Sequence, residues 1–313
     1  MRVWRCQCVG VMVLLSLGVM SSVSEAQDKP RSEQGPVASE QNWQIGSTPS
    51  YSSGNFGTNT TSSFFYAPLS IRRLFRDGDV TLIIPFVTAM TDGRTTLVGG
   101  NAVRIDDNSG GNSGPGGGGG ADDNGCSGKG QSGSGSNRTC GTTSRTAGQK
   151  VTTSGLGDII LRGRYYLVDE KDWIPLIAVT GRLKLPTASA SQGLGTGEMD
   201  EGVGMEASKR LGDRWITFLD GGFNVIGRPQ GLNLRNQWWY DAGVGYYVTN
   251  NLLGSVYFEE YRSLVSGRQN IRDVFFAMNY KASSAWRFTG GVTAGVSNGA
   301  PDYGISVGTS YRF

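Results

Sequence analysis

Apolar and polar side chains alternate along most of the chain, and the clearest case is the stretch from Asp302 to Phe313. Residues two apart share one face of a β-strand, so this stretch presents one apolar face and one face of small or charged residues. The same alternation predicts twelve strands, over residues 43–53, 61–75, 79–91, 155–168, 172–186, 200–211, 214–227, 236–249, 251–264, 271–282, 285–297 and 302–313.

Short turns and longer segments alternate between these predicted strands. Turn-forming residues occupy positions 76–78, 169–171, 212–213, 250–251 and 283–284. The remaining connections are longer, over 54–60, 92–154, 187–199, 228–235, 265–270 and 298–301. An even number of strands with short turns at one end and long loops at the other predicts an all-β chain, a transmembrane antiparallel up-and-down β-barrel of about 12 strands.

The faces opposite the apolar ones carry charges of both signs, which we expect to line the barrel lumen. An Arg or Lys on the lipid face would cost ~2–4 kcal/mol at the membrane midplane. We therefore expect a polar interior, wet or salt-bridged, with a narrow pore or one plugged by side chains. The candidate lumen-lining residues of a solute path are Asp158, Arg162, Arg164, Arg182, Lys184, Glu206, Arg210, Asp220, Asp241, Glu259, Asp273, Lys281, Arg287 and Arg312.

Aromatic residues lie next to the predicted short turns. Trp173, Trp215, Trp286 and Tyr247 occupy such positions. Aromatic side chains at both membrane interfaces are typical of membrane proteins, so we expect these four in an interfacial girdle. The alternative is core packing in a soluble β-sandwich.

The N-terminal residues have the pattern of an export signal. A basic start, an apolar run from Val9 to Met20 and a small-x-small sequence ending at Ala26 predict a signal peptide over 1–26. The run is too short to span a bilayer as a helix. Cys6 and Cys8 lie too early for a lipoprotein. We expect a flexible leader over 27–42 and the barrel over 43–313.

Composition separates the remaining membrane classes. Beyond residue 27 no apolar stretch has the length of a spanning helix, the mean hydropathy is −0.27 and the chain has 49 glycines. This excludes a helical membrane protein. An exported chain of this kind is either a soluble periplasmic β protein or an outer-membrane barrel. The net charge of +3 indicates no nucleic-acid partner.

The segment 92–154 breaks the alternation, and we expect it to be an extracellular loop insertion. Its Gly/Ser-rich part cannot bury enough apolar surface to become ordered. Cys126 and Cys140 form an even pair in an oxidising compartment, and a disulfide between them would contribute roughly 3 kcal/mol. Two free thiols are the alternative. The acids of 106–107 and 122–123 fit solvated loop residues better than calcium ligands.

Catalytic chemistry is poorly supported. The chain has no histidine, so Ser-His-Asp hydrolysis and histidine metal sites are excluded. Asp220, Asp241 or Glu206 are possible acid/base groups, but structural charge pairing is the better interpretation. We expect no enzyme activity, no metal and no cofactor.

Two resemblances extend this interpretation. The aromatic end of the last strand resembles the closing strand of bacterial outer-membrane barrels, which implies that Tyr311 and Phe313 act as the signal for the barrel assembly machinery. Several segments are similar to the outer-membrane family associated with the meta pathway of phenol degradation, itself distantly like long-chain fatty-acid transporters. These segments are Tyr51 to Thr58, Phe65 to Ser70, Leu82 to Phe86, Ser154 to Asp158, Lys184 to Thr187 and Leu194 to Asp200.

The family resemblance implies a channel in the outer membrane of a Gram-negative bacterium, in contact with its lipid, for passive uptake or efflux of small solutes, including hydrophobic or aromatic ones. The long Gly/Ser insertion departs from the family pattern. The alternative is a structural or surface-interaction barrel, like an adhesin or receptor, that acts through the loop 92–154.

Overall fold

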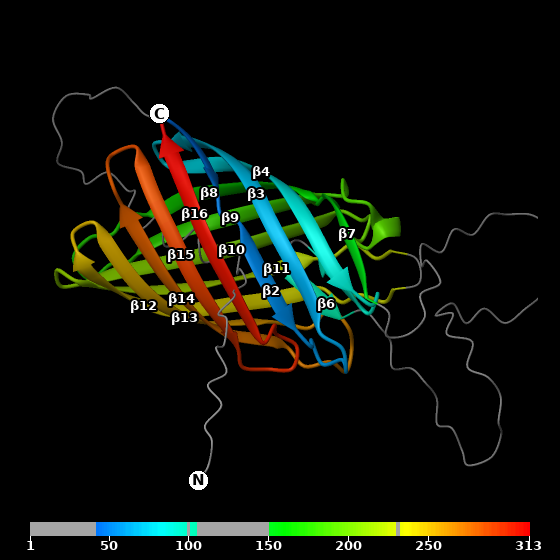
Figure 1. Ribbon diagram of the computed structural model, residues 1–313. Coiled ribbons are helices and arrows are strands. Elements are labelled where there is room, and N and C mark those ends of the chain that lie inside the picture. Colours follow the sequence, from blue (N-terminus) through cyan, green and yellow to red (C-terminus); the bar gives the residue numbers. More distant parts are fainter. Residues whose placement is uncertain (1–41, 99–100, 105–149, 230–231) are drawn as a thin grey trace, which may run out of the picture.

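The computed structural model describes residues 42–98, 101–104, 150–229 and 232–313. Its strands form one closed wall (Figure 1) and a separate hairpin. The wall consists of β1 (Trp43–Ser47), β2 (Ser50–Gly54), β3 (Ser62–Phe75), β4 (Gly78–Thr91), β7 (Val151–Leu156), β8 (Ile159–Val168), β9 (Leu176–Leu185), β10 (Asp200–Leu211), β11 (Trp215–Val225), β12 (Gln237–Thr249), β13 (Leu252–Tyr261), β14 (Ile271–Lys281), β15 (Trp286–Gly295) and β16 (Tyr303–Arg312).

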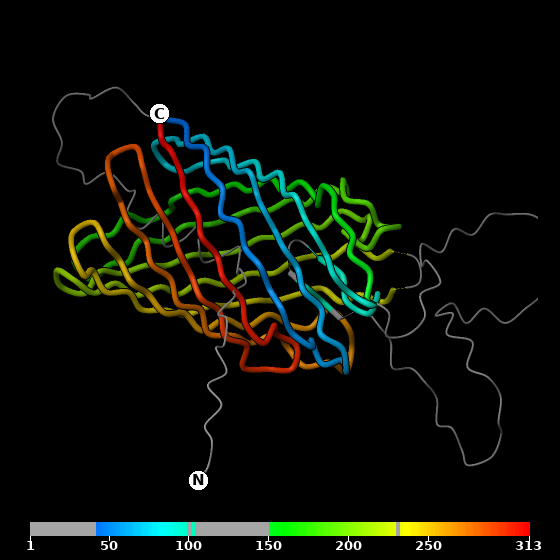
Figure 2. The backbone as a smooth tube through the Cα atoms, in the orientation of Figure 1, coloured from blue at the N-terminus to red at the C-terminus, as the bar shows by residue number. Residues whose placement is uncertain are grey.

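The first and last strands close the barrel. β16 pairs with β15 on one side and with β1 and β2 on the other, where Ile45 lies opposite Tyr311 and Tyr51 lies opposite Ile305. β1 and β2 both pair with β3, and β7 and β8 both pair with β4, so each of these two pairs is one interrupted strand. The result is a closed antiparallel barrel of twelve strands, as the alternation predicted. Figure 2 follows the chain around this wall.

Alternation decides which side chains face outward. On β10 and β14, Val203, Met205, Phe276 and Met278 are exposed, whereas the intervening residues are buried or half-buried. Because all backbone groups of a closed barrel pair between strands, the apolar outer face can contact lipid without leaving an unpaired edge. The buried face is the barrel interior.

Three of the four predicted girdle aromatics lie on the outer surface, and one does not. Trp173, Trp215 and Trp286 are exposed near the short turns. Tyr247 is only 9% exposed and packs inside the barrel, so its assignment to the girdle was wrong. On this strand the neighbouring residue, Tyr246, faces outward instead of Tyr247. The centroid of the Tyr246 ring lies 4.9 Å from that of the Trp215 ring.

The segment 92–154 contains more regular structure than expected. β5 (Thr95–Val98) pairs with β6 (Asn101–Arg104) in a hairpin, and the strand that follows the loop begins at Val151, earlier than predicted. A short 3₁₀ helix, η1 (Ala190–Gln192), lies between β9 and β10. Within the described ranges, no helix has the length and apolar character needed to cross a membrane.

Several sequence predictions lie outside the described residues. These are the signal peptide, the leader up to residue 41, the Gly/Ser-rich run, the loop acids and the cysteine pair Cys126 and Cys140.

Candidate solute path inside the barrel

Buried ion pairs join β3, β4, β8 and β10 inside the barrel. The Arg72 guanidinium lies 2.8 Å from the Asp79 carboxylate. Arg164 contacts Glu206 at 2.7 Å, and Arg162 contacts the same carboxylate at 2.5 Å. Charges that are removed from water need partners of opposite sign. These pairs therefore compensate part of the interior charge.

Glu206 reaches the two arginines across an intervening strand. It lies on β10, whereas Arg162 and Arg164 lie on β8, with β9 between them. The β9 residue directly opposite Glu206 is Ala178, whose small side chain leaves the way open. The single methyl group of Ala178 on β9 thus permits ion pairs between side chains of β8 and β10, the strands on either side.

A second charged group lies at the loop end of the barrel. The Lys184 side chain is fully buried, and its Nζ lies 2.8 Å from Asp200 and 3.3 Å from Asp158. It also donates a hydrogen bond of 3.0 Å to the Thr196 hydroxyl, and the Ala188 N–H donates to Asp158. These contacts fasten the loop between β9 and β10 to the barrel mouth.

A row of carboxylates crosses the next four strands. Glu206 lies opposite Asp220 on β11, which lies opposite Asp241 on β12, followed by Glu259 on β13 and Asp273 on β14. We call Asp220, Asp241, Glu259 and Asp273 the acid row. All four are buried. Like charges directly opposite one another destabilise a sheet, so a row of this kind requires a source of positive charge or protons.

Aromatic rings lie on both sides of the acid row. Toward the short turns, Tyr257 lies 5.2 Å from Phe218 and 6.3 Å from Phe275, measured between ring centroids. We call these three the inner aromatic layer. Toward the long loops, the rings of Trp239 and Tyr261 stack at 6.2 Å, and we call them the outer aromatic pair. The residues of the inner aromatic layer and of the outer aromatic pair are each two positions along a strand from a residue of the acid row. The rings and the acids therefore lie on the same face of the sheet, the face toward the interior.

Glycines in the wall leave room for these rings. The position that a Cβ would take at Gly222 lies 2.9 Å from the Trp239 ring, and a Cβ at Gly243 would meet the Tyr257 ring. Any larger residue at these positions would force the ring away from the wall. The ring positions therefore depend on residues of the neighbouring strands.

On β11 to β14, the barrel interior is apolar toward the short turns. Ile216, Phe218, Tyr247, Leu253, Tyr257, Phe275 and Ala277 form one buried apolar cluster there. The expectation of a polar interior is wrong for this part of the barrel. The alternating pattern could not show this, because inward apolar residues on β11 to β14 alternate with outward apolar residues and read as continuous hydrophobic runs.

The β5–β6 hairpin packs across the loop end of the barrel. Leu97 and Ala102 join a buried cluster with Phe64 and Val87 from the wall. Val98 and Val103 join another, with Ile226, Leu234, Leu264 and Val265 from the loops on the other side. With apolar contacts on both faces, the hairpin links wall and loops into a cover over the mouth. The Gly99-Gly100 pair between two apolar pairs is a hairpin signal that the sequence interpretation passed over.

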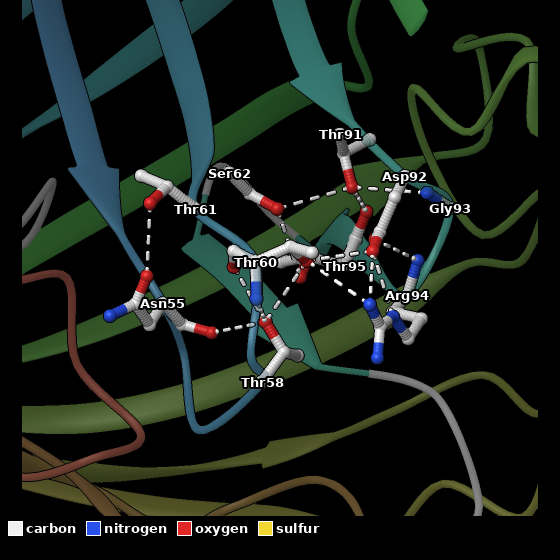
Figure 3. A network of polar contacts seen from close by, with 10 residues as sticks. All are labelled: Asn55, Thr58, Thr60, Thr61, Ser62, Thr91, Asp92, Gly93, Arg94 and Thr95. Atoms are coloured by element: carbon white, nitrogen blue, oxygen red, sulfur yellow. Dashed lines mark hydrogen bonds and ion pairs between the residues drawn. The ribbon is translucent and has the colours of Figure 1, made fainter. Parts of the chain in front are cut away.

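Polar contacts hold the start of this hairpin (Figure 3). Asp92 accepts hydrogen bonds from the Thr60 hydroxyl at 2.7 Å and from Arg94 Nε at 2.8 Å. Ser62 donates to Thr91 at 3.3 Å. Burial of Asp92 raises the pKa of its carboxyl, but the hydrogen bonds from Arg94 and Thr60 outweigh burial and hold this pKa below its usual value. Asp92 is therefore a charged anchor of the hairpin at neutral pH.

The remaining predicted lumen residues lie at several levels. Arg182 lies opposite Arg162, and Arg287 is buried on β15. Arg210, Lys281 and Arg312 lie at the strand ends near the short turns, where exposed Arg210 donates to the Tyr247 hydroxyl at 3.4 Å. A solute path through these residues stays a prediction.

A hollow of about 840 Å³ lies on the outer wall rather than in the lumen. Its lining includes the outward residues Val80, Tyr165, Val179, Val203 and Met205. Outward Gly163 and Gly181, directly paired, leave the surface low there. We assign this apolar hollow to lipid contact and not to the solute path.

Comparison with models of known protein families assigns the chain to one family. The family model described as putative MetA-pathway of phenol degradation matches residues 77–313, well over half of the sequence. The chain belongs to this family. A search of curated proteins found no match.

A solved structure of an outer-membrane channel has a similar fold. The COG4313 outer membrane channel from Pseudomonas putida F1 superposes with a TM-score of 0.54 at 13% identity, over 91% of this chain and 99% of that one. The KdgM porin superposes with a TM-score of 0.48 at 8% identity, over 86% and 99% of the two chains. The CymD monoaromatic hydrocarbon channel has a TM-score of 0.40 at 8% identity, over 87% and 88%. The chain is a bacterial outer-membrane β-barrel.

Proposed function

We propose that this protein is a passive outer-membrane channel for small solutes. The observation that carries the proposal is the interior of the closed barrel, where ion pairs, the acid row and aromatic rings face inward at successive levels. A barrel serving only as an anchor has no need to bury so many charges, each of which costs free energy to desolvate. Membership of the family described as putative MetA-pathway of phenol degradation also supports a channel function.

The β5–β6 hairpin bears on the alternative of a surface-interaction barrel. This described part of the 92–154 insertion packs into the mouth between the wall and the other loops, and it does not project as a binding surface. A narrow hollow of about 170 Å³ remains beside it, lined by residues that include Phe56, Val103, Gly267 and Ile271. We take this hollow as the entrance from outside.

Conductance of the purified full chain in planar bilayers tests the channel. We expect small, discrete conductance steps from the wild-type protein. Deletion of 95–104 should raise the conductance, because the apolar cover of the mouth is lost. Deletion of 108–121, in the Gly/Ser-rich part of the same insertion, is the matched control and should leave the conductance unchanged. Absence of any conductance from correctly folded barrels, with or without the hairpin, would refute the proposal.

A further inference from the structure

We propose that the outer surface of the barrel at the loop ends of β12, β13 and β14 binds the phosphorylated head group of a lipid in the outer leaflet of the membrane. Arg235, Arg262 and Arg272 lie there, and we call them the arginine patch. The inference goes beyond the proposed function and does not depend on it, because the patch lies on the lipid side and rim of the wall and not in the solute path.

The outer face of these strands changes from apolar to aromatic to charged toward the long loops. On β14, exposed Met278 and Phe276 are followed on the same face by Arg272. On β12, the exposed rings of Trp238 and Tyr240 stack with their centroids 6.0 Å apart. Trp and Tyr at such a boundary mark the level of the lipid head groups, and the long loops of outer-membrane barrels face the cell exterior. The arginine patch therefore lies at the head groups of the outer leaflet.

Arg272 is held in position and still has donors to offer. It lies directly opposite Glu260, and its guanidinium is 3.0 Å from that carboxylate. The Tyr240 hydroxyl and the Asn270 amide donate to the same carboxylate at 2.8 Å and 2.7 Å. The Arg272 side chain nevertheless remains 49% exposed. A guanidinium has five N–H donors in a fixed fork, so Arg272 can bind a second anion while it keeps this ion pair.

Arg262 adds a positive charge that no carboxylate neutralises within the described residues. It follows β13 directly, and its backbone N–H donates to the Trp238 carbonyl at 2.9 Å, which continues the pairing of β13 with β12. Its guanidinium donates to the Asn236 carbonyl at 3.5 Å. Burial lowers the pKa of the Arg235 guanidinium, and the neighbouring charge of Arg262 lowers it further. An anion bound between them would relieve this repulsion.

The register of β13 and β14 places Arg262 and Arg272 within reach of one phosphate group. Tyr261 lies opposite Ile271, so Arg262 comes opposite position 270 and Arg272 is its diagonal neighbour on the same face. Diagonal neighbours of this kind are about 7–8 Å apart, a separation that long side chains bridge. Two guanidinium forks can then grip the oxygens of one phosphate, for which arginine has the matching geometry.

The surroundings favour a lipid at this place on the rim. Exposed Glu201 lies at the loop end of β10, and exposed Asp302 precedes β16, so both flanking regions would repel an anionic head group. Exposed Phe258 and Phe276 lie on the same outer face nearer the middle of the barrel, where acyl chains would cover them. A phosphate attached to acyl chains satisfies the arginines and the apolar surface together, whereas a soluble anion satisfies only the arginines.

Native mass spectrometry of the purified full-length protein in detergent tests the inference with two lipids. Diphosphoryl lipid A is the first probe, and monophosphoryl lipid A lacks one of its phosphates. We expect the diphosphoryl form to bind about tenfold more tightly, because its further phosphate gains charged hydrogen bonds. Arg262→Gln, which breaks no described ion pair, should abolish this preference. Arg214→Gln removes an arginine beside the Tyr246 ring at the opposite end of the barrel, and this matched control should bind as the wild type does.

Three results would overturn the lipid site. These are equal binding of the two lipids, binding that Arg262→Gln leaves unchanged, and displacement of bound lipid by an equal concentration of sodium tripolyphosphate, which would show a preference for soluble anions. Heat-dependent gel mobility of each variant establishes that the barrel is folded. If Arg262→Gln does not fold, Arg272→Gln takes its place with the same expected loss. None of these results depends on conductance, so the channel proposal is tested separately.

Discussion

At the scale of single residues, wall glycines position the interior rings. Gly243→Ala places a methyl group against the Tyr257 ring. Overpacking of this kind costs about 1–3 kcal/mol, so we expect a lower urea midpoint for unfolding from lipid vesicles. Gly254→Ala on the adjacent strand is the control, because nothing lies within 4 Å of its Cβ position. Equal midpoints for the two variants would contradict the assignment.

The charge of Asp92 gives the cover a dependence on pH. Its pKa is held below the usual value, so its contribution is fully present above the usual carboxyl pKa and is lost as pH falls through the lowered one. We expect channel flicker to increase at acidic pH below about 4. Asp92→Asn should show the increase already at neutral pH and lose the dependence. Recordings across this range check both expectations, and a pH-independent wild type would argue against the anchor.

The Glu206 carboxylate compensates two arginines at once. Glu206→Gln leaves Arg162 and Arg164 buried without that charge, and breaking a buried pair costs about 3–5 kcal/mol. We expect a large fall in the free energy of unfolding. Glu170→Gln breaks a more exposed pair with Lys209 and should cost about 0–1 kcal/mol. Similar losses for the two variants would show that the interior pair is weaker than its burial implies.

At the scale of elements, the insertion between β4 and β7 begins with a hairpin that packs on the barrel. Its first part forms the β5–β6 hairpin, whose pairs Leu97/Val98 and Ala102/Val103 have partners in both flanking clusters. Four-residue strands are too short to show an alternation of their own. Their pairing becomes stable only because the barrel mouth and the loops supply apolar surface on both faces, and that surface comes from residues distant in sequence.

The cysteines of this insertion are proposed to form a disulfide. Because Cys126 and Cys140 are the only cysteines after residue 8, no other intramolecular pairing exists in an exported chain. We expect alkylation under non-reducing, denaturing conditions to leave both thiols unmodified, and mass spectrometry to show two added groups after reduction. The Cys126→Ser variant should expose one reactive thiol. Two reactive thiols in the unreduced wild type would refute the disulfide.

At the scale of the whole molecule, the last strand completes the wall. β16 pairs with β1, β2 and β15, so closure depends on this strand. We propose that Tyr311 and Phe313 are its assembly signal. Deletion of Phe313 should slow insertion by the assembly machinery and lower the amount of folded barrel in outer membranes. Phe75→Ala, which removes an exposed aromatic at the end of β3, just before the β3–β4 turn, is the control and should leave the assembly rate unchanged. Equal rates would refute the signal.

Local alternation along the chain was enough to determine the twelve strands of the wall, the barrel class and which face of each wall strand is inward, because a charge on the lipid face is strongly disfavoured wherever it occurs. The predicted outward direction was wrong only for Tyr247, where two tyrosines are adjacent and either can fit the outer face. What the tertiary structure alone decided is which inward residues meet. The acid row depends on register between strands, the aromatic layers depend on glycines of neighbouring strands, and the hairpin depends on distant loops. Register and packing are properties of pairs of segments, and no single segment carries them.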